Sequence, residues 1–233
     1  MRPAKQLKTF WAQDESLTLL LGAVVLLVFF VHPLVEVGWL AKTFITAAGA
    51  MILATGMLVV SGRRWLTASG AVLAALTLLI DVRGLFAPSP WLEASRNFCF
   101  FLFLGLLNSV IMNRVMRDGP VNRHRIQGAI LAYLILGLTW SQAYQCLEAL
   151  NPGSFSIPNP IPGSEGLSLK LTYFSFVTLT TVGYGDITAV HSFARCLAVL
   201  EALTGQLFPT ILIARLVALQ VESYKPNRSS RED

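Results

Sequence analysis

Residues 180–186, with the sequence TTVGYGD, combine residue types and a spacing that suit the coordination of a cation. A cation that leaves water needs rigidly held replacement oxygens, and backbone carbonyls provide them only if consecutive ones point the same way. A regular strand alternates its carbonyls, whereas glycine adopts the unusual backbone angles that align them at no steric cost. Gly183 and Gly185 supply two such positions. The segment therefore predicts a cation-coordinating backbone.

The side chains of this segment have their own predicted roles. Thr181 adds a hydroxyl at the inner mouth, while Val182 and Tyr184 point away from the ion path and wedge the strand against its surroundings. At every position, Thr180–Asp186 resembles the filter signature of the potassium channel superfamily. Seven matches between two apolar spans make chance a poor explanation. The resemblance covers Ile126–Leu219 and implies an outer helix, a pore helix, a selectivity filter and an inner helix.

The resemblance also implies where the ion binds and how the chain assembles. The implied potassium ligands are the backbone carbonyls of Thr181, Val182, Gly183 and Tyr184 and the hydroxyl of Thr181, with Gly185 completing the filter. One chain supplies one filter strand, so a ring of four strands implies a homotetramer with closed symmetry. Potassium is then the permeant ion, and no cofactor is expected.

Residues around the filter are expected to support it. The pore helix, over about Ser168–Thr180, would direct the negative end of its dipole at a central cavity and favour a cation there. Members of the superfamily often use a pore-helix tryptophan to hydrogen-bond the acidic residue after the filter. Here only Tyr173 could serve Asp186, so a bond between these two residues is a hypothesis.

The inner helix carries candidate gating residues. Gly205 stands where the superfamily commonly has a hinge glycine, and Pro209 cannot donate to the carbonyl of Gly205 four residues earlier. A hinge, a static kink and close helix packing are the alternatives for this pair. Glu201 and Arg215 are charges at membrane depth. For Glu201 a role facing the pore competes with hydrogen bonding behind the filter, and for Arg215 it competes with snorkelling to the membrane surface.

Composition predicts that these elements lie in a membrane. The 233 residues are 54% apolar and only 13% charged, whereas soluble domains average about 25% charged residues. Six stretches are long enough, or nearly so, to cross about 30 Å of hydrocarbon. They are Leu17–Leu34, Phe44–Ser61, Trp65–Phe86, Asn97–Met112, Ile126–Leu147 and Phe193–Leu219. Asn151–Gly166, rich in proline, glycine, serine and asparagine, is predicted to be loop.

The predicted fold class is an all-α membrane protein with six transmembrane helices, a re-entrant pore helix and a filter, in a tetrameric pore. Lysine and arginine gather at one set of span ends, which places both termini in the cytoplasm. The predicted divisions are an N-terminus at 1–16, a four-helix membrane domain at 17–116, a linker at 117–125, the pore domain at 126–219 and a tail at 220–233. The four-helix domain resembles a voltage-sensor fold, and the short tail suggests a prokaryotic inner membrane.

The fourth span lacks the arginine ladder of a voltage sensor. Every third residue from Arg96 is uncharged until Arg114 and Arg117 at the inner end. Steep voltage gating takes several charges per subunit, so weak or absent voltage dependence is predicted. Asp81 and Arg83 are expected to pair with each other or with Arg96.

A basic cluster follows the fourth span and has two explanations. It comprises Arg114, Arg117, Arg123 and Arg125, with His124 beside them. These residues could bind anionic lipid headgroups, but the positive-inside rule explains them equally well. Nucleic acid is not expected as a partner, because the basic residues lie between apolar runs.

Other function classes are weaker alternatives. A non-selective cation channel would normally show a degraded filter, and a potassium uptake or transporter subunit would resemble four pore hairpins in one chain with a reduced motif. A subunit that conducts only in heteromers is a further alternative. The chain has no HExxH motif and no nucleophile elbow, so it is not expected to be an enzyme.

Overall fold

The computed structural model describes residues 17–31, 42–60, 64–87, 89–117, 123–158 and 164–224. The first helix covers Leu17–Phe30, and its end forms the π-helical turn η1 (Leu27–Val31). The helices that follow are α3 (Lys42–Val60), α4 (Arg64–Phe86), α5 (Pro90–Val115), α6 (Arg123–Leu150), α7 (Ser164–Leu179) and α8 (Ser192–Tyr224). Two short strands, β1 (Phe155–Ser156) and β2 (Thr188–Ala189), form an antiparallel pair. The predicted class of all-α membrane protein is confirmed.

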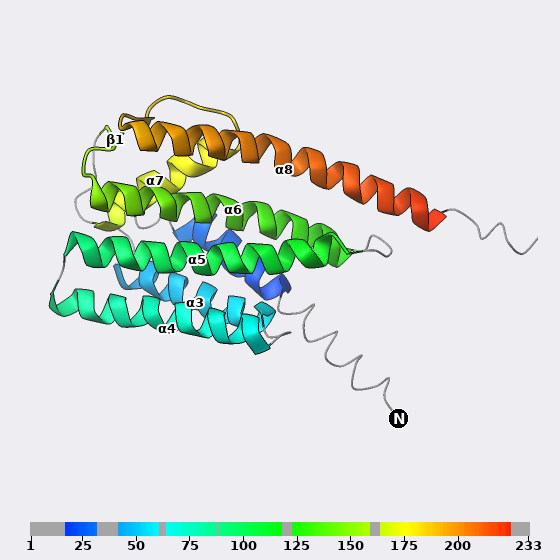
Figure 1. The fold of residues 1–233 in the computed structure, drawn as a ribbon, viewed down its shortest axis with the longest axis horizontal. Coiled ribbons are helices and arrows are strands. Elements are labelled where there is room, and N and C mark those ends of the chain that lie inside the picture. The colour runs from blue at the N-terminus through cyan, green and yellow to red at the C-terminus, as the bar shows by residue number, and fades with distance from the viewer. Residues whose placement is uncertain are drawn as a thin grey trace, which may run out of the picture.

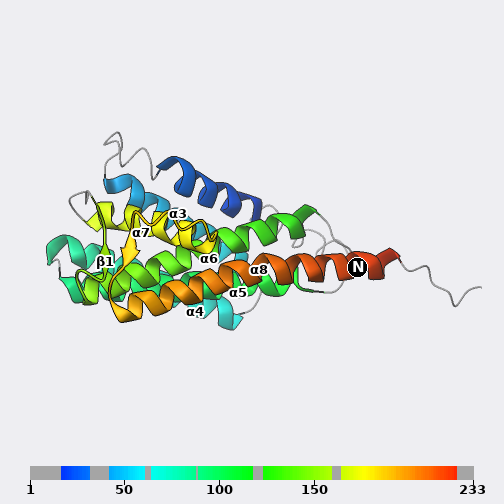
Figure 2. The same cartoon turned by 90° about the horizontal axis from the view of Figure 1, so that it is seen from above.

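The helices α5 and α6 form the centre of the bundle. They lie side by side, with α3 and α4 packed against α5 and with α7 and α8 packed on the other side against α6 (Figure 1). The view from above shows the first helix beside α3 and the long α8 running past the ends of the other helices (Figure 2). The short α7 lies between α6 and the first half of α8.

One apolar core joins the two halves of the chain. Its fully buried members include Leu20 of the first helix, Phe103 and Leu107 of α5 and Ile135 of α6, and the mostly buried Leu212 of α8 belongs to the same cluster. Lipid tails are as apolar as these side chains, so close van der Waals packing holds such helices together better than the hydrophobic effect does.

Four of the predicted spans are long and apolar enough to cross a membrane. They correspond to Arg64–Gly84, Pro90–Val115, Arg123–Leu150 and Ser192–Val221. The first two predicted spans are represented among the described residues by shorter apolar helices, Leu17–Phe30 and Gly49–Val59. The total of six spans therefore stays a prediction.

Two predicted boundaries differ from the structure. Helix α5 begins at Pro90 and not near Asn97, because the Ser89 side chain accepts the backbone N–H of Leu92 at 3.3 Å and proline suits the first helical turn. The prediction that Asn151–Gly166 is entirely loop was wrong. This segment contains β1, and α7 begins at Ser164 and not at Ser168, since serine and glutamate are both favoured at a helix start.

Candidate functional site

The backbone of the TTVGYGD segment has an alternating conformation. Thr181, Gly183 and Gly185 have φ angles of 59°, 58° and 79°, whereas the intervening Val182 and Tyr184 are not among the residues with positive φ. A positive φ is uncommon for threonine and marks a backbone that its surroundings hold in place. Alternation of φ from residue to residue abolishes the regular strand geometry, in which successive carbonyls point in opposite directions.

The same segment lies on the surface of the single protomer. Val182 is 53% exposed and Tyr184 is 72% exposed. Val182 is apolar and Tyr184 is aromatic. Further chains are therefore needed if these side chains are to pack against protein.

Helix α7 leads directly into this segment. The backbone N–H groups of Val182 and Gly183 donate to the carbonyl of Val177 at 3.0 and 3.3 Å, which turns the chain sharply at the helix end. The last carbonyls of a helix have no partner within it. At Leu179 the partner is the hydroxyl of Tyr133 in α6, which donates to the carbonyl oxygen at 3.1 Å.

The far side of the segment is fixed by the proline-rich loop. Strands β1 and β2 pair Phe155 with Ala189, and the carbonyl of Ser154 accepts the N–H groups of Val190 and His191 at 2.8 and 3.1 Å. Phe155 also packs edge-on against Phe174 of α7, with ring centroids 5.4 Å apart. The loop that contains Ser154 and β1 therefore fixes the position of the residues that follow the TTVGYGD segment.

Tyr173 and Asp186 lie together beside the segment. Tyr173 is 39% exposed, and its hydroxyl is the group that the sequence analysis assigned to Asp186. Both residues line a cavity of about 280 Å³, together with Pro158, Leu169, Lys170 and Ile187. The two residues therefore lie at the same cavity, and the hydrogen bond between them stays a prediction.

The sequence analysis missed the partners of Glu201 in a buried polar network behind α7. Glu201 of α8 is fully buried, accepts a hydrogen bond from Tyr144 of α6, and lies 2.5 Å from the Ser175 hydroxyl of α7. Beside it, Ser141 and Thr172 share a hydrogen bond of 2.8 Å across α6 and α7. Small polar residues in apolar helices were the only signal in the sequence. Glu201 thus lies in the interior position that competed with a role facing the pore.

Gly205 brings α8 close to the backbone at the end of α7. An added Cβ atom would lie 1.9 Å from the carbonyl oxygen of Leu179. Helix α8 continues through both Gly205 and Pro209. Close helix packing is therefore the feature that the structure displays at Gly205, and the hinge stays a prediction. Arg215 lies further along α8 and is partly buried.

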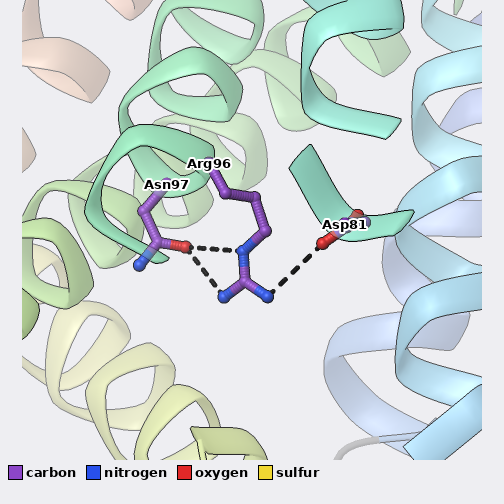
Figure 3. A network of polar contacts seen from close by, with 3 residues as sticks. All are labelled: Asp81, Arg96 and Asn97. Atoms are coloured by element: carbon purple, nitrogen blue, oxygen red, sulfur yellow. Dashed lines mark hydrogen bonds and ion pairs between the residues drawn. The ribbon is translucent and has the colours of Figure 1, made fainter. Parts of the chain in front are cut away.

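The charged residues of the third and fourth spans form a separate network. Arg96 of α5 forms an ion pair with Asp81 of α4 at 3.5 Å, and its guanidinium donates to the Asn97 side chain at 3.0 and 3.2 Å (Figure 3). This pairing is one of the alternatives expected from the sequence. At the other end of α5, Arg114 donates to the backbone carbonyl of Val59 at 2.5 Å.

Comparisons with known proteins agree with this site. A protein family described as "Ion channel" matches residues 161–222, which include α7, the TTVGYGD segment and most of α8. Protein LctB of Bacillus caldotenax is 29% identical over 128 residues, covering 50% of this chain and 94% of the relative. The voltage-gated potassium channel Kch of Escherichia coli K12 is 29% identical over 120 residues, covering 50% of this chain and 24% of the relative. No solved structure matches the chain.

The fold and the family match together indicate a multi-pass membrane protein with an ion channel domain. The family match lies in α7, the TTVGYGD segment and α8, which carry the resemblance to the potassium channel superfamily.

Proposed function

We propose that this chain is the subunit of a homotetrameric potassium-selective channel that passes K⁺ down its electrochemical gradient. The alternating φ angles at Thr181, Gly183 and Gly185 carry the proposal. Successive carbonyls of Thr181, Val182, Gly183 and Tyr184, with the Thr181 hydroxyl, would then face one axis and replace the hydration shell of the ion. Gly185 and Thr180 complete the strand.

The exposure of Val182 and Tyr184 supports assembly around that axis. A single strand surrounds no ion, and a membrane-facing filter would leave its carbonyls unsatisfied in lipid. Four copies related by a rotation axis close the ring and bury these two side chains against neighbouring subunits. The apolar face of α8 that is exposed in the protomer, including Leu203 and Leu207, would line the cavity or contact neighbours.

The proposed topology follows the positive-inside rule, with both termini and the basic cluster in the cytoplasm and the proline-rich loop outside. The division into a four-helix domain and a pore domain, and a prokaryotic inner membrane, belong to the same proposal. Anionic lipid at Arg114, Arg117, Arg123 and Arg125 is a secondary part of it. The pairing of Arg96 with Asp81 supports weak voltage dependence, because a paired charge is held in place.

The test is the reversal potential of the purified chain in planar bilayers with a tenfold gradient of potassium against sodium. Reversal near the potassium equilibrium potential supports the proposal, and Gly183→Ser should abolish it because serine is strained at the positive φ of this position. Reversal near zero in the unmodified chain would favour a non-selective cation channel. Transport of potassium against its gradient would favour an uptake subunit.

A further inference from the structure

Glu201 links three helices through a chain of oxygen contacts. One carboxyl oxygen accepts the Tyr144 hydroxyl proton from α6, and the other lies 2.5 Å from the Ser175 hydroxyl of α7. The Ser175 oxygen also lies 2.7 Å from the backbone carbonyl of Gly137 in α6. Glu201 and Ser175 have no exposed surface. Water therefore has no access to these hydrogen-bonding groups in this conformation.

The number of protons shared among these contacts decides the charge of Glu201. Three contacts of hydrogen-bond length need three protons, and the hydroxyls of Tyr144 and Ser175 carry only one each. Tyr144 uses its proton on Glu201. Suppose that Glu201 is ionised. If Ser175 then donates its proton to the Gly137 carbonyl, no proton lies between Ser175 and Glu201. If Ser175 donates to Glu201, no proton lies between Ser175 and the Gly137 carbonyl. A protonated Glu201 resolves the conflict, because the acid donates to Ser175 and Ser175 donates to Gly137.

The surroundings of Glu201 agree with a neutral acid. Among the described residues, the titratable groups that face it are Tyr144 and Tyr133, both from α6. Helix α7 contributes the hydroxyl of Ser175, and within α8 the Thr204 hydroxyl donates to the backbone carbonyl of Glu201 at 2.8 Å. None of these groups carries a positive charge. A buried carboxylate without a cationic partner is strongly unfavourable.

We propose that Glu201 is a protonated carboxylic acid that positions the pore helix, so that conduction decreases at alkaline pH when the acid loses its proton. Ser175 lies one helical turn before Leu179, where α7 ends and the filter begins. Loss of the Glu201 proton to water would break the contact between Ser175 and Gly137 or that between Ser175 and Glu201, and would place a charge between α6, α7 and α8. The pore helix would then shift against both neighbours. The gating role rests on the proposed potassium conduction.

The experiment combines infrared spectroscopy with potassium flux on the full chain reconstituted in liposomes. Glu201→Gln is the key variant, because its amide donates to Ser175 and accepts from Tyr144 as the neutral acid does. Glu93→Gln, in the first turn of α5, is the matched control. We expect a protonated-carboxyl band at neutral pH in the unmodified chain and in Glu93→Gln that is absent from Glu201→Gln.

Raising the pH should remove this band and reduce flux over the same pH range. The expected fall in flux is about tenfold, a common size for coupling between two equilibria. Flux through Glu201→Gln should change less than about twofold over that range, whereas Glu93→Gln should follow the unmodified chain. Ser175→Ala provides a second test, because it removes the acceptor of the acid proton and should shift the band.

Several results would overturn the inference. An identical carboxyl region in the unmodified chain and in Glu201→Gln would mean that Glu201 is charged. The same alkaline fall in flux in Glu201→Gln would remove its gating role, and an unshifted band in Ser175→Ala would contradict the contact itself. A chain with no potassium-selective flux would overturn the proposed function and the gating role with it, while the infrared spectra would still report the protonation state separately.

Discussion

Gly205 of α8 lies against the carbonyl group of Leu179, where an added Cβ atom would come within 1.9 Å of the oxygen. The same oxygen accepts the hydroxyl proton of Tyr133 from α6 at 3.1 Å. The end of α7, where the filter segment begins, is therefore held between two long helices. A displacement of α8 at this level has to move the start of the filter.

Gly205→Ala should disrupt this contact. The added methyl group would meet the backbone carbonyl of Leu179, which cannot rotate away as a side chain can. Helices α7 and α8 must therefore separate, which should lower the free energy of unfolding by about 3 kcal/mol. Thermal unfolding and potassium flux should both be impaired. Gly105→Ala in α5 is the control, because its added Cβ meets nothing within 4 Å. Normal stability and flux in Gly205→Ala would contradict the close approach.

Tyr133→Phe removes one hydroxyl and keeps the ring, which packs against Phe208 with centroids 5.6 Å apart. The Leu179 carbonyl would lose its partner, and the free energy of unfolding should fall by about 1 kcal/mol. Chemical denaturation of the solubilised protein measures this loss. Since the carbonyl precedes the filter, single-channel recordings should also show shorter openings. Unchanged stability and opening times would mean that water replaces the hydroxyl.

Tyr173→Phe tests the predicted hydrogen bond between Tyr173 and Asp186, which line the same cavity, and should destabilise the conducting filter. We expect current decay to accelerate by about three- to tenfold, which corresponds to one hydrogen bond of ordinary strength. A double-mutant cycle with Asp186→Asn isolates the pair, because the two changes should not be additive if the residues interact. Additive effects, or decay as slow as in the unmodified channel, would rule out the bond.

Arg96→Gln should leave the dependence of conductance on voltage flat. Its ion pair with Asp81 is partly exposed, with side chains 32% and 28% accessible, so the loss should cost no more than about 1 kcal/mol of stability. Voltage ramps in bilayers measure the voltage dependence of the conductance, and thermal unfolding measures the change in stability. A steep voltage dependence that Arg96→Gln abolishes would show that Arg96 senses the field.

The sequence predicted the unusual backbone angles at Gly183 and Gly185 because this signal is local. Conformational freedom at Gly183 and Gly185 is a property of those residues, and apolar length alone indicates α4, α5, α6 and α8 as spans. The starts of α5 and α7 were predicted less accurately. The Ser89 cap and the first turn of α7 depend on short-range hydrogen bonds that compete with loop conformations. Strand β1 needed a partner more than thirty residues away, so no pattern within the loop could predict it.

The sequence by itself therefore determined the ion channel class, the backbone angles at Gly183 and Gly185 and the membrane setting, because each follows from residue type and spacing along one stretch of backbone. Only the tertiary structure decided the position of Glu201 among Tyr144 and Ser175, and the contact of Gly205 with Leu179. Those relationships join residues from three different helices. Their geometry depends on how the helices pack against one another, which periodicity and hydropathy do not specify.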